Sequence, residues 1–540
     1  MTETSLYFKI AKELSIDAKQ VKSTVELLDE GATVPFISRY RKEVTGSLDE
    51  VQVLTIKNEI ERLRQLEQRR ESILKSISGQ GKLTEELEQK ILAAELLSTL
   101  EDLYLPFKPR RRTKATIARE KGLEPLATLI LEQKTSNLFQ EALSFVNKEL
   151  EVNSPDEALQ GARDIISEIM SEDAVVREGM RVLFKSSAII KSKVIRGKEE
   201  EGQKFEDYFE WEEKLMTCPS HRMLAMRRGE KEDFLILDIV IDDELAHEQI
   251  KKQFIKTKNE CAEQISLAIE DGYKRLLQPS IEAEMRLMTK QIADEKAIQV
   301  FADNLRELLL ASPLGQKSIL ALDPGFRTGC KVVALDAQGK LLEETVIYPH
   351  EPQRRVTESQ HIVLAFCAKH GIEAIAIGNG TASRETEQFI RNIEVLPKSI
   401  PVIMVSESGA SIYSASDVAR EEFPDYDLTV RGAVSIGRRL ADPLAELVKL
   451  DAKSIGVGQY QHDVDQTALK NKLDTVVMSC VNGVGVELNT ASKQLLSYVS
   501  GIGDTLAKNI VDYRNENGAF KSRKDLLKVN RMGDKVFEQC

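Results

Sequence analysis

The spacing of the apolar residues changes abruptly near Gly315, and this change restricts the chain to folds that join a helical part to an α/β part. From Met1 to about Leu310, apolar residues recur mostly every three or four positions, as in IISEIM, which is the period of an amphipathic helix. One exception, FLILDIVIDD, fits either a strand or the end of a buried helix. The sequence before Leu310 is therefore predicted to be mostly helical.

After Leu314-Gly315, short apolar runs of strand length alternate with helical stretches. SILALDPG, GCKVVALD and LLEETVIYP form three runs, and the turn AQGK predicts a hairpin of the last two. The helix HIVLAFCAKHG, the strand EAIAIGNG, the helix SRETEQFIRNI, the strand PVIMVSE and further helix follow. The predicted order is βββαβαβα, and beyond Gly456 a polar segment leads into a final helical region.

Charge and cysteine content restrict the compartment and the partners. The 75 Lys and Arg against 87 Asp and Glu give a net charge of −12, so a surface that binds nucleic acid has to be local. The six cysteines lie far apart without CxxC spacing, and no histidine pair has HxxxH spacing, which argues against metal sites and disulfides. No apolar run reaches about 18 residues. We expect a cytoplasmic protein without metal, cofactor or membrane contact.

Two Gly-containing hairpins, thirty residues apart, lie near the end of the chain: VSGIGDTLAKNI and VNRMGDKVFEQC. Glycine permits positive φ, and the first amides of the helix that follows suit a phosphate group. Such contacts hold a backbone without reading its bases. The alternative is a structural pair of helices that joins domains. The candidate nucleic-acid-binding residues are Gly501, Gly503, Lys508, Lys521, Arg523, Lys524, Arg531 and Gly533.

A second basic patch lies in PFKPRRRTK, where the cations are Arg110, Arg111, Arg112 and Lys114. This run suits contact with nucleic acid or with a transcription partner, and it suits a solvated loop equally well.

The α/β region resembles the ribonuclease H-like fold, in its YqgF-like branch related to Holliday junction resolvases. Nucleases of that fold hold divalent metal with acids after strand one, after strand four and on a late helix. Asp323 in LALDPG meets the first requirement, whereas Asn379 stands at the second position. Glu407 and Asp442 are the remaining candidates for a remnant site. Alternatively, Asp323 only caps the DPG turn.

Several long motifs extend this resemblance to the whole chain: TVPFISRYRKEVTGSLDE, LEDLYLPFKPRRRTKATIAREKGLEPLA, CPSHRMLAMRRGE, LDPGFRTG and IGNGTASRET. Together they closely resemble the Tex family of bacterial transcription accessory proteins. The resemblance implies a helical N-terminal region with a helix-turn-helix-like element, a YqgF-like domain without nuclease activity, tandem helix-hairpin-helix motifs and an OB-fold RNA-binding domain. The OB-fold has no counterpart before Cys540, so we expect a shortened chain or an incomplete product.

The predicted fold is mostly α and multidomain, with one ribonuclease H-like α/β domain, an elongated helical N-terminal half and tandem helix-hairpin-helix motifs. The predicted domains are 1–195 (helical, with the helix-turn-helix-like element), 196–315 (helical, central), 316–455 (YqgF-like) and 456–540 (hairpin motifs, the second cut short).

The leading functional hypothesis is a non-enzymatic scaffold that binds DNA, RNA or both in transcription. The alternative is a metal-dependent nuclease or junction resolvase that uses Asp323 with Glu407 or Asp442. A third hypothesis, compatible with the first, is an adaptor that binds the transcription machinery through the helical half.

Overall fold

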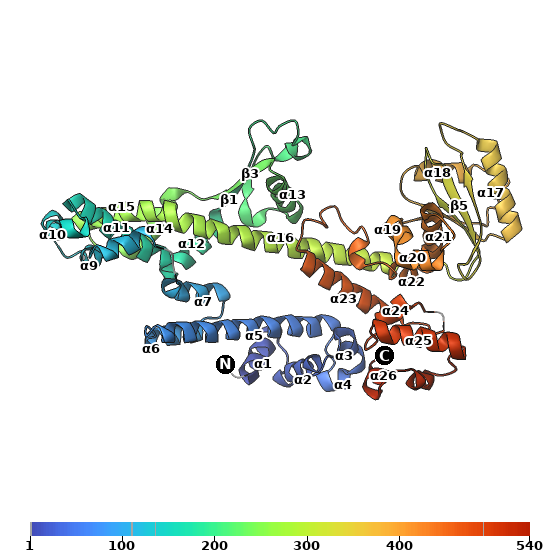
Figure 1. Cartoon of the computed structure of the whole chain (residues 1–540), viewed down its shortest axis with the longest axis horizontal. Helices are drawn as coiled ribbons and strands as arrows, with labels where there is room; N and C mark the ends of the chain where they lie inside the picture. Colours follow the sequence, from blue (N-terminus) through green and yellow to red (C-terminus); the bar gives the residue numbers. More distant parts are fainter. Residues whose placement is uncertain (1–2, 110–111, 136, 490) are drawn as a thin grey trace. The chain divides into compact units, whose positions relative to one another are not determined.

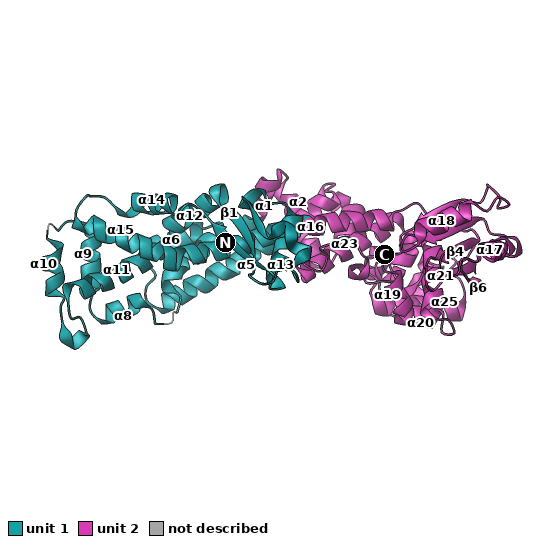
Figure 2. Cartoon of the chain, turned by 90° about the horizontal axis from the view of Figure 1, so that it is seen from above, with its two compact units in different colours: residues 1–6, 58–296 teal, residues 7–57, 297–540 magenta. Residues whose placement is uncertain are grey.

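The computed structural model describes residues 3–109, 112–135, 137–489 and 491–540. The chain divides into two compact units, coloured separately in Figure 2. The first unit contains the chain up to Leu6 together with Asn58–Lys296, and the second contains Tyr7–Lys57 together with Ala297–Cys540. Helices predominate in both units, as predicted (Figure 1).

Three helices cross the boundaries between the units: α1 (Glu3–Leu14), α5 (Glu50–Gly79) and α16 (Gln278–Leu309). The other helices of the first unit are α6 (Glu85–Ala93), α7 (Leu97–Tyr104), α8 (Lys114–Glu120), α9 (Glu124–Glu132), α10 (Leu138–Ser144), α11 (Pro155–Glu172), α12 (Ala174–Ser187), α13 (Ser220–Lys231), α14 (Asp243–Phe254) and α15 (Glu260–Gly272). A π-helical turn, Tyr273–Leu277, joins α15 to α16.

The helix α11 shows why the periodic segments fold as predicted. The side chain of Ser154 accepts a hydrogen bond from the amide of Glu157, and Pro155 occupies the first helical position, where its missing N–H costs nothing. Apolar side chains then recur at helical spacing and are buried, including Ile165, Ile166 and Met170 of the IISEIM run. The capping residues and the amphipathic period of this segment therefore both favour a helix that begins at Pro155.

The first unit also contains a three-stranded antiparallel sheet in the order β2-β1-β3. Its strands are β1 (Ile189–Val194), β2 (Glu210–Lys214) and β3 (Leu235–Val240). The ambiguous run FLILDIVIDD thus forms the strand β3. The strands β1 and β2 were not predicted, because both are short and β2 has the sequence EWEEK, whose charges conceal the alternation of a strand.

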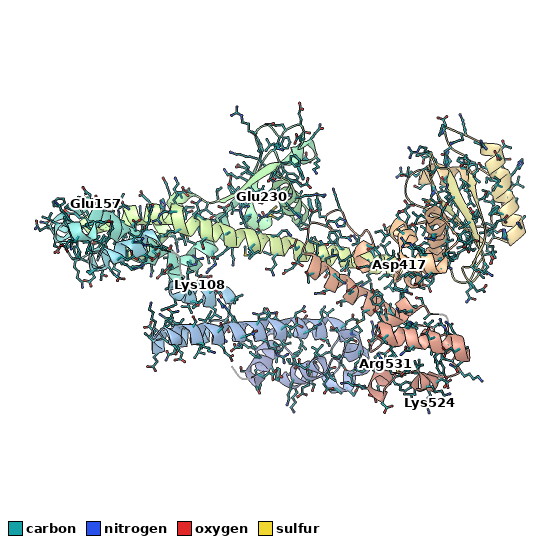
Figure 3. All side chains as sticks on the ribbon, in the orientation of Figure 1. Lys108, Glu157, Glu230, Asp417, Lys524 and Arg531 are labelled. Atoms are coloured by element: carbon teal, nitrogen blue, oxygen red, sulfur yellow. The ribbon has the colours of Figure 1, made fainter. Side chains whose placement is uncertain are left out.

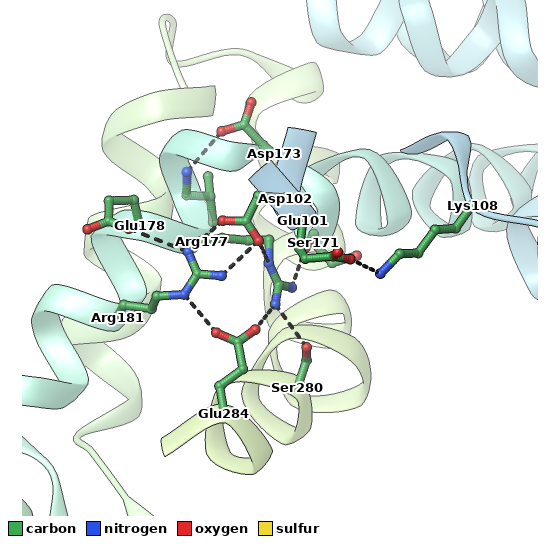
Figure 4. A network of polar contacts seen from close by, with 11 residues as sticks. Glu101, Asp102, Lys108, Ser171, Asp173, Arg177, Glu178, Arg181, Ser280 and Glu284 are labelled. Atoms are coloured by element: carbon green, nitrogen blue, oxygen red, sulfur yellow. Dashed lines mark hydrogen bonds and ion pairs between the residues drawn. The ribbon is translucent and has the colours of Figure 1, made fainter. Parts of the chain in front are cut away.

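A buried ionic cluster links α7, α12 and α16 (Figure 4). Asp102 accepts hydrogen bonds from Arg177 Nε at 2.8 Å and from Arg181 Nη2 at 2.7 Å. Glu284 on α16 contacts both arginines as well. Burial opposes the charge of Arg181, but Asp102 and Glu284 raise its pKa above the ordinary value. The three helices are therefore held together by buried ion pairs, and breaking one of these pairs is strongly destabilising.

The second unit contains the α/β domain, whose strands are β4 (Ile319–Asp323), β5 (Cys330–Leu335), β6 (Leu341–Ile347), β7 (Ala374–Gly378) and β8 (Val402–Val405). Their order in the sheet is β6-β5-β4-β7-β8, with β5 antiparallel to β4 and to β6, and with β7 parallel to both β4 and β8. The helices of this domain are α17 (Val356–His370), α18 (Ser383–Arg391), α19 (Ala410–Ala415), α20 (Asp417–Glu422), α21 (Leu428–Ala441) and α22 (Pro443–Leu447).

The alternation of side chains along β4 accounts for the layers of this domain. Leu320 and Leu322 pack beneath α17 and α18, whereas Ile319 and Ala321 face α21. Helices therefore cover both faces of the sheet (Figure 1). The order of elements and the β5-β6 hairpin are as predicted.

The remaining helices of the second unit come from the two ends of the sequence. Near the start are α2 (Ala18–Asp29), α3 (Val34–Tyr40) and α4 (Lys42–Thr45); near the end are α23 (Gln466–Val484), α24 (Lys493–Ser497), α25 (Asp504–Asn517) and α26 (Asp534–Gln539). Five consecutive residues of α3, from Val34 to Ser38, are buried. The short helix α3 therefore contributes to the core of this unit.

Candidate nucleic-acid interface

The first hairpin has the predicted geometry. Gly501 has a φ of 82°, in the left-handed region, and Gly503 is extended and forms the N-cap of α25. The helix α25 begins at Asp504 and ends at Asn517, followed by Gly518 with a φ of 82°. The glycine positions in VSGIGDTLAKNI therefore predicted the turn and the start of the helix that follows it.

Gly501 is required for a second reason besides its φ. A Cβ atom at this position would lie 2.9 Å from the Cβ of Gln539 on α26. The two hairpins therefore pack closely at Gly501. Gly503 has nothing within 4 Å of the position of its missing Cβ, so its open side faces solvent.

The second hairpin repeats the backbone of the first. Ile502 N donates to Val499 O at 2.9 Å, and the equivalent bond joins Met532 N to Val529 O at 3.1 Å. Gly533 is extended and caps α26, as Gly503 caps α25. Arg531 takes the place of Gly501 and keeps its positive φ, at 69°. The second copy is thus a genuine hairpin, with a strained non-glycine residue at its turn.

Both hairpin helices begin with open amides. In the described part of the chain, no side chain caps α25 or α26. Within the same residues, the amides of Gly503, Asp504 and Thr505 donate to no backbone or side-chain acceptor. These three residues are exposed. Unsatisfied amides at the positive end of a helix dipole form the arrangement that binds an anion such as phosphate.

Four of the predicted cations in the hairpin module, residues 499–540, have no acidic partner in the part of the chain that the structure describes. Lys508, Lys521, Lys524 and Arg531 are exposed, and within the described ranges none of them forms an ion pair (Figure 3 labels the last two). Arg523 differs, because its guanidinium lies 5.1 Å from the centre of the Phe537 ring and donates to Phe537 O. Arg523 is also exposed, but it contacts α26 through Phe537.

The two hairpins differ in charge at equivalent positions. Lys508 of α25 corresponds to Glu538 of α26, thirty residues later, and Glu538 pairs with Arg41 at 3.2 Å. Lys535, near the start of α26, donates to Glu30 O and lies 3.7 Å from its carboxylate. The first hairpin is therefore the better anion site of the two.

The second basic patch is only partly described. Arg110 and Arg111 lie outside the described residues. Arg112 pairs with Glu120 at 2.6 Å, and Lys114 begins α8. The described arginine of this patch thus has an acidic partner.

The three candidate acids of the α/β domain do not all lie at one site. Asp323 ends β4, and Glu407 follows β8 at the same edge of the sheet. Asp442 instead caps α22 by accepting from Ala445 N at 3.0 Å, beside the segment that precedes β4. Asp442 is ten residues along the chain from Gly432, which lies against Asp323, so the two acids are separated by about 15 Å of helix. Asp442 therefore does not join Asp323.

Asp323 and Glu407 influence each other electrostatically. Burial, and then the charge of Glu407, raises the pKa of Asp323 to about 6. Asn379, where a nuclease of this fold has its second acid, uses its side-chain oxygen to accept from Glu407 N at 3.1 Å. Gly432, on the late helix α21, has no side chain to offer. Among the described residues, no group of three or more His, Cys, Asp or Glu side chains is arranged to hold a metal ion.

Four family models match consecutive parts of the chain. The Tex-like protein N-terminal domain matches residues 4–78, and the Tex central region-like model matches residues 133–301. The Tex protein YqgF-like domain matches residues 317–441, and the helix-hairpin-helix motif matches residues 481–540. The last match includes both hairpins described above.

Similar proteins occur in bacteria and in animals. The "Transcriptional accessory protein Tex" of Neisseria gonorrhoeae is 47% identical over 98% of this chain and 70% of its own length. The "Uncharacterized protein YdcI" of Bacillus subtilis is 47% identical over 100% of this chain and 76% of its own length. The human "S1 RNA-binding domain-containing protein 1" is 33% identical over 98% of this chain and 55% of its own length.

The fold and the hairpins define a helix-hairpin-helix protein that carries a YqgF-like domain, a combination that implies interaction with nucleic acid. The chain belongs to the Tex family of transcriptional accessory proteins. No described helix is both long enough and apolar enough to cross a membrane.

Proposed function

We propose that this protein is a non-enzymatic, cytoplasmic scaffold that binds the phosphate backbone of nucleic acid in transcription without reading base sequence. The observation that carries the proposal is the first hairpin, where, among the described residues, the amides at the start of α25 are open and the exposed, unpaired Lys508 lies one turn into the same helix. Amides and lysines recognise phosphate groups, which are the same at every base.

The charge of the whole protein makes this local surface important. The net charge of −12 repels nucleic acid in general, so binding depends on the cations of the hairpin module. Arg531 adds a charge at the second hairpin, where the acid Glu538 is already paired with Arg41. The hairpin module therefore offers phosphate a locally favourable surface on an acidic protein.

An equilibrium binding measurement tests the proposal. We expect the fluorescence anisotropy of a labelled 20-base-pair DNA duplex and of a 20-nucleotide RNA to show binding that weakens steeply with salt. Lys508→Glu with Lys521→Glu should weaken binding of either probe. Lys340→Glu with Lys398→Glu is the matched control, because it changes the charge equally at exposed lysines of the α/β domain. Equal affinity of the two double variants would refute the proposal.

The absence of nuclease activity is part of the proposal. It is supported by Asn379 and Gly432, which stand where a nuclease of this fold needs acids, and by the distance of Asp442 from Asp323. One observation favours the alternative of a metal-dependent nuclease: the carboxylates of Asp323 and Glu407 interact at one edge of the sheet. Incubation of the protein with Mg²⁺ or Mn²⁺ and with linear or branched DNA distinguishes the scaffold from the nuclease. Cleavage by the protein that is lost in Asp323→Asn would establish the alternative.

A role as an adaptor for the transcription machinery extends the proposal to protein partners. The helical first unit would supply the binding surface. Capture experiments with the whole chain, compared with Lys508→Glu/Lys521→Glu and with nuclease-treated extract, separate a direct protein partner from one that is bridged by nucleic acid. Loss of every captured polymerase subunit after nuclease treatment would contradict a direct contact.

A further inference from the structure

Ser500, the residue before Gly501, is held from two sides. Its amide donates to Asn482 Oδ1 at 3.0 Å, and its hydroxyl shares a hydrogen bond of 2.9 Å with the hydroxyl of Thr33. Asn482, on α23, also donates to Tyr498 O at 2.8 Å. Ser500 is only 1% exposed, so water does not compete for these bonds. The turn of the first hairpin is therefore fixed by two segments that lie outside it.

Thr33 is itself firmly placed. It is the N-cap of α3, where its hydroxyl accepts from Phe36 N, and α3 buries Phe36 and its neighbours. Arg39, at the other end of α3, donates to Ser479 O on α23 at 3.1 Å and pairs with Glu50. The helix α3 thus packs on α23, and Thr33 reaches the hairpin from a rigid support.

The second hairpin provides an internal comparison. Asn530 stands where Ser500 stands in the first copy, and it is exposed. In the part of the chain that the structure describes, the amide and the side chain of Asn530 have no hydrogen-bond partner comparable to Thr33 or Asn482. The second hairpin contacts the N-terminal helices through Arg41–Glu538 and Lys535–Glu30, surface pairs that water and salt weaken.

We propose that Thr33 and Asn482 are positioning residues that keep the first hairpin in its phosphate-binding shape, and that the segment α2-α4 is thereby a working part of the interface. The inference deepens the proposed function and rests on it. A binding loop that is already ordered loses less conformational entropy when the ligand arrives, so the same contacts yield higher affinity. Because Thr33 carries no charge, its effect should leave the number of phosphate contacts unchanged.

The test uses the whole chain and the 20-base-pair duplex. Thr33→Val removes the shared hydrogen bond at nearly constant volume, and Ser500→Ala removes it from the other side. We expect each variant to bind about three- to tenfold more weakly, which is the worth of one hydrogen bond, with an unchanged salt slope. Thr33→Ser keeps the hydroxyl and should restore wild-type affinity. Thr475→Val is the matched control, because Thr475 bonds only its own helix at Asn471 O.

Hydrogen exchange of the free protein separates this inference from the proposed function. Thr33→Val and Ser500→Ala should speed exchange at the amide of Ile502 and leave that of Met532 unchanged. Unchanged exchange at Ile502, or faster exchange with wild-type affinity, overturns the positioning role. If the wild-type protein itself shows no salt-dependent binding, the proposed function fails, whereas the exchange result still reports on whether Thr33 holds the hairpin.

Discussion

Each hairpin cation should make a definite contribution to the salt dependence of nucleic-acid binding. Lys508, Lys521, Lys524 and Arg531 are exposed without ion pairs among the described residues. If each neutralises one phosphate of duplex DNA, the logarithm of the binding constant should fall with the logarithm of salt concentration at a slope of about −3.6. The wild-type protein should then lose about 150-fold in affinity between 50 mM and 200 mM salt.

Replacement of lysine by glutamine removes the charge and keeps a good helix former. Lys508→Gln alone should reduce the slope to about −2.7, and the triple variant with Lys521→Gln and Lys524→Gln should reduce it to about −0.9. The triple variant should then lose only about 3.5-fold over the same salt range. Lys398→Gln is the control and should keep the wild-type slope.

Fluorescence anisotropy titrations at five salt concentrations measure these slopes. The reasoning is refuted if the triple variant keeps the wild-type slope, or if Lys398→Gln reduces the slope as much as Lys508→Gln does. A slope near zero in the wild-type protein would mean that the cations do not contact phosphate.

Three further predictions concern stability. Asp102→Asn leaves two buried arginines with one carboxylate fewer, so the free energy of unfolding should fall by about 3–5 kcal/mol. Calorimetry should show this loss as a lower melting temperature. Glu178→Gln removes an exposed partner of Arg181 and should cost less than about 1 kcal/mol. Equal effects would contradict the buried network. Gly501→Ala should destabilise by about 1–3 kcal/mol in urea unfolding because of its positive φ and its contact with α26, and Gly503→Ala by less than about 1 kcal/mol. Because its pKa is raised to about 6 in the folded protein, Asp323 destabilises the fold above that pH, so Asp323→Asn should raise the free energy of unfolding at pH 7.5 and lose this advantage near pH 4. An advantage independent of pH would contradict that assignment.

The elements with a clear period or a clear turn were predictable from the sequence. The strands β4, β7 and β8 are short apolar runs, β5 and β6 flank the AQGK turn, and the glycines of the first hairpin determine where α25 begins. Local chemistry decides these features, so a short window of sequence contains the information. The strands β1 and β2 were missed, because β1 is stabilised by pairing with β2 and β3, and β2 by pairing with β1, rather than by their own residues.

The candidate site was predictable only in part, for the same reason. The exposed lysines and the positive φ of Gly501 follow from residue type, but the role of Arg523 depends on Phe537, fourteen residues later. Thr33 reads in sequence as an ordinary N-cap before Val34-Pro35, and nothing in TVPF indicates that its hydroxyl also meets Ser500. The separation of Asp442 from Asp323 likewise depends on the direction of α21 across the sheet.

The bond between Thr33 and Ser500 joins residues that are 467 positions apart in the chain, so this contact can form only late in synthesis. Ribosomes add about 5–20 residues per second, so the N-terminal helices leave the ribosome about 25–90 seconds before their partner exists. During that interval α3 can pack against α2 and α4, but its later partner α23 has not yet been made. The N-terminal helices should therefore reach their final packing only after the last part of the chain has been made.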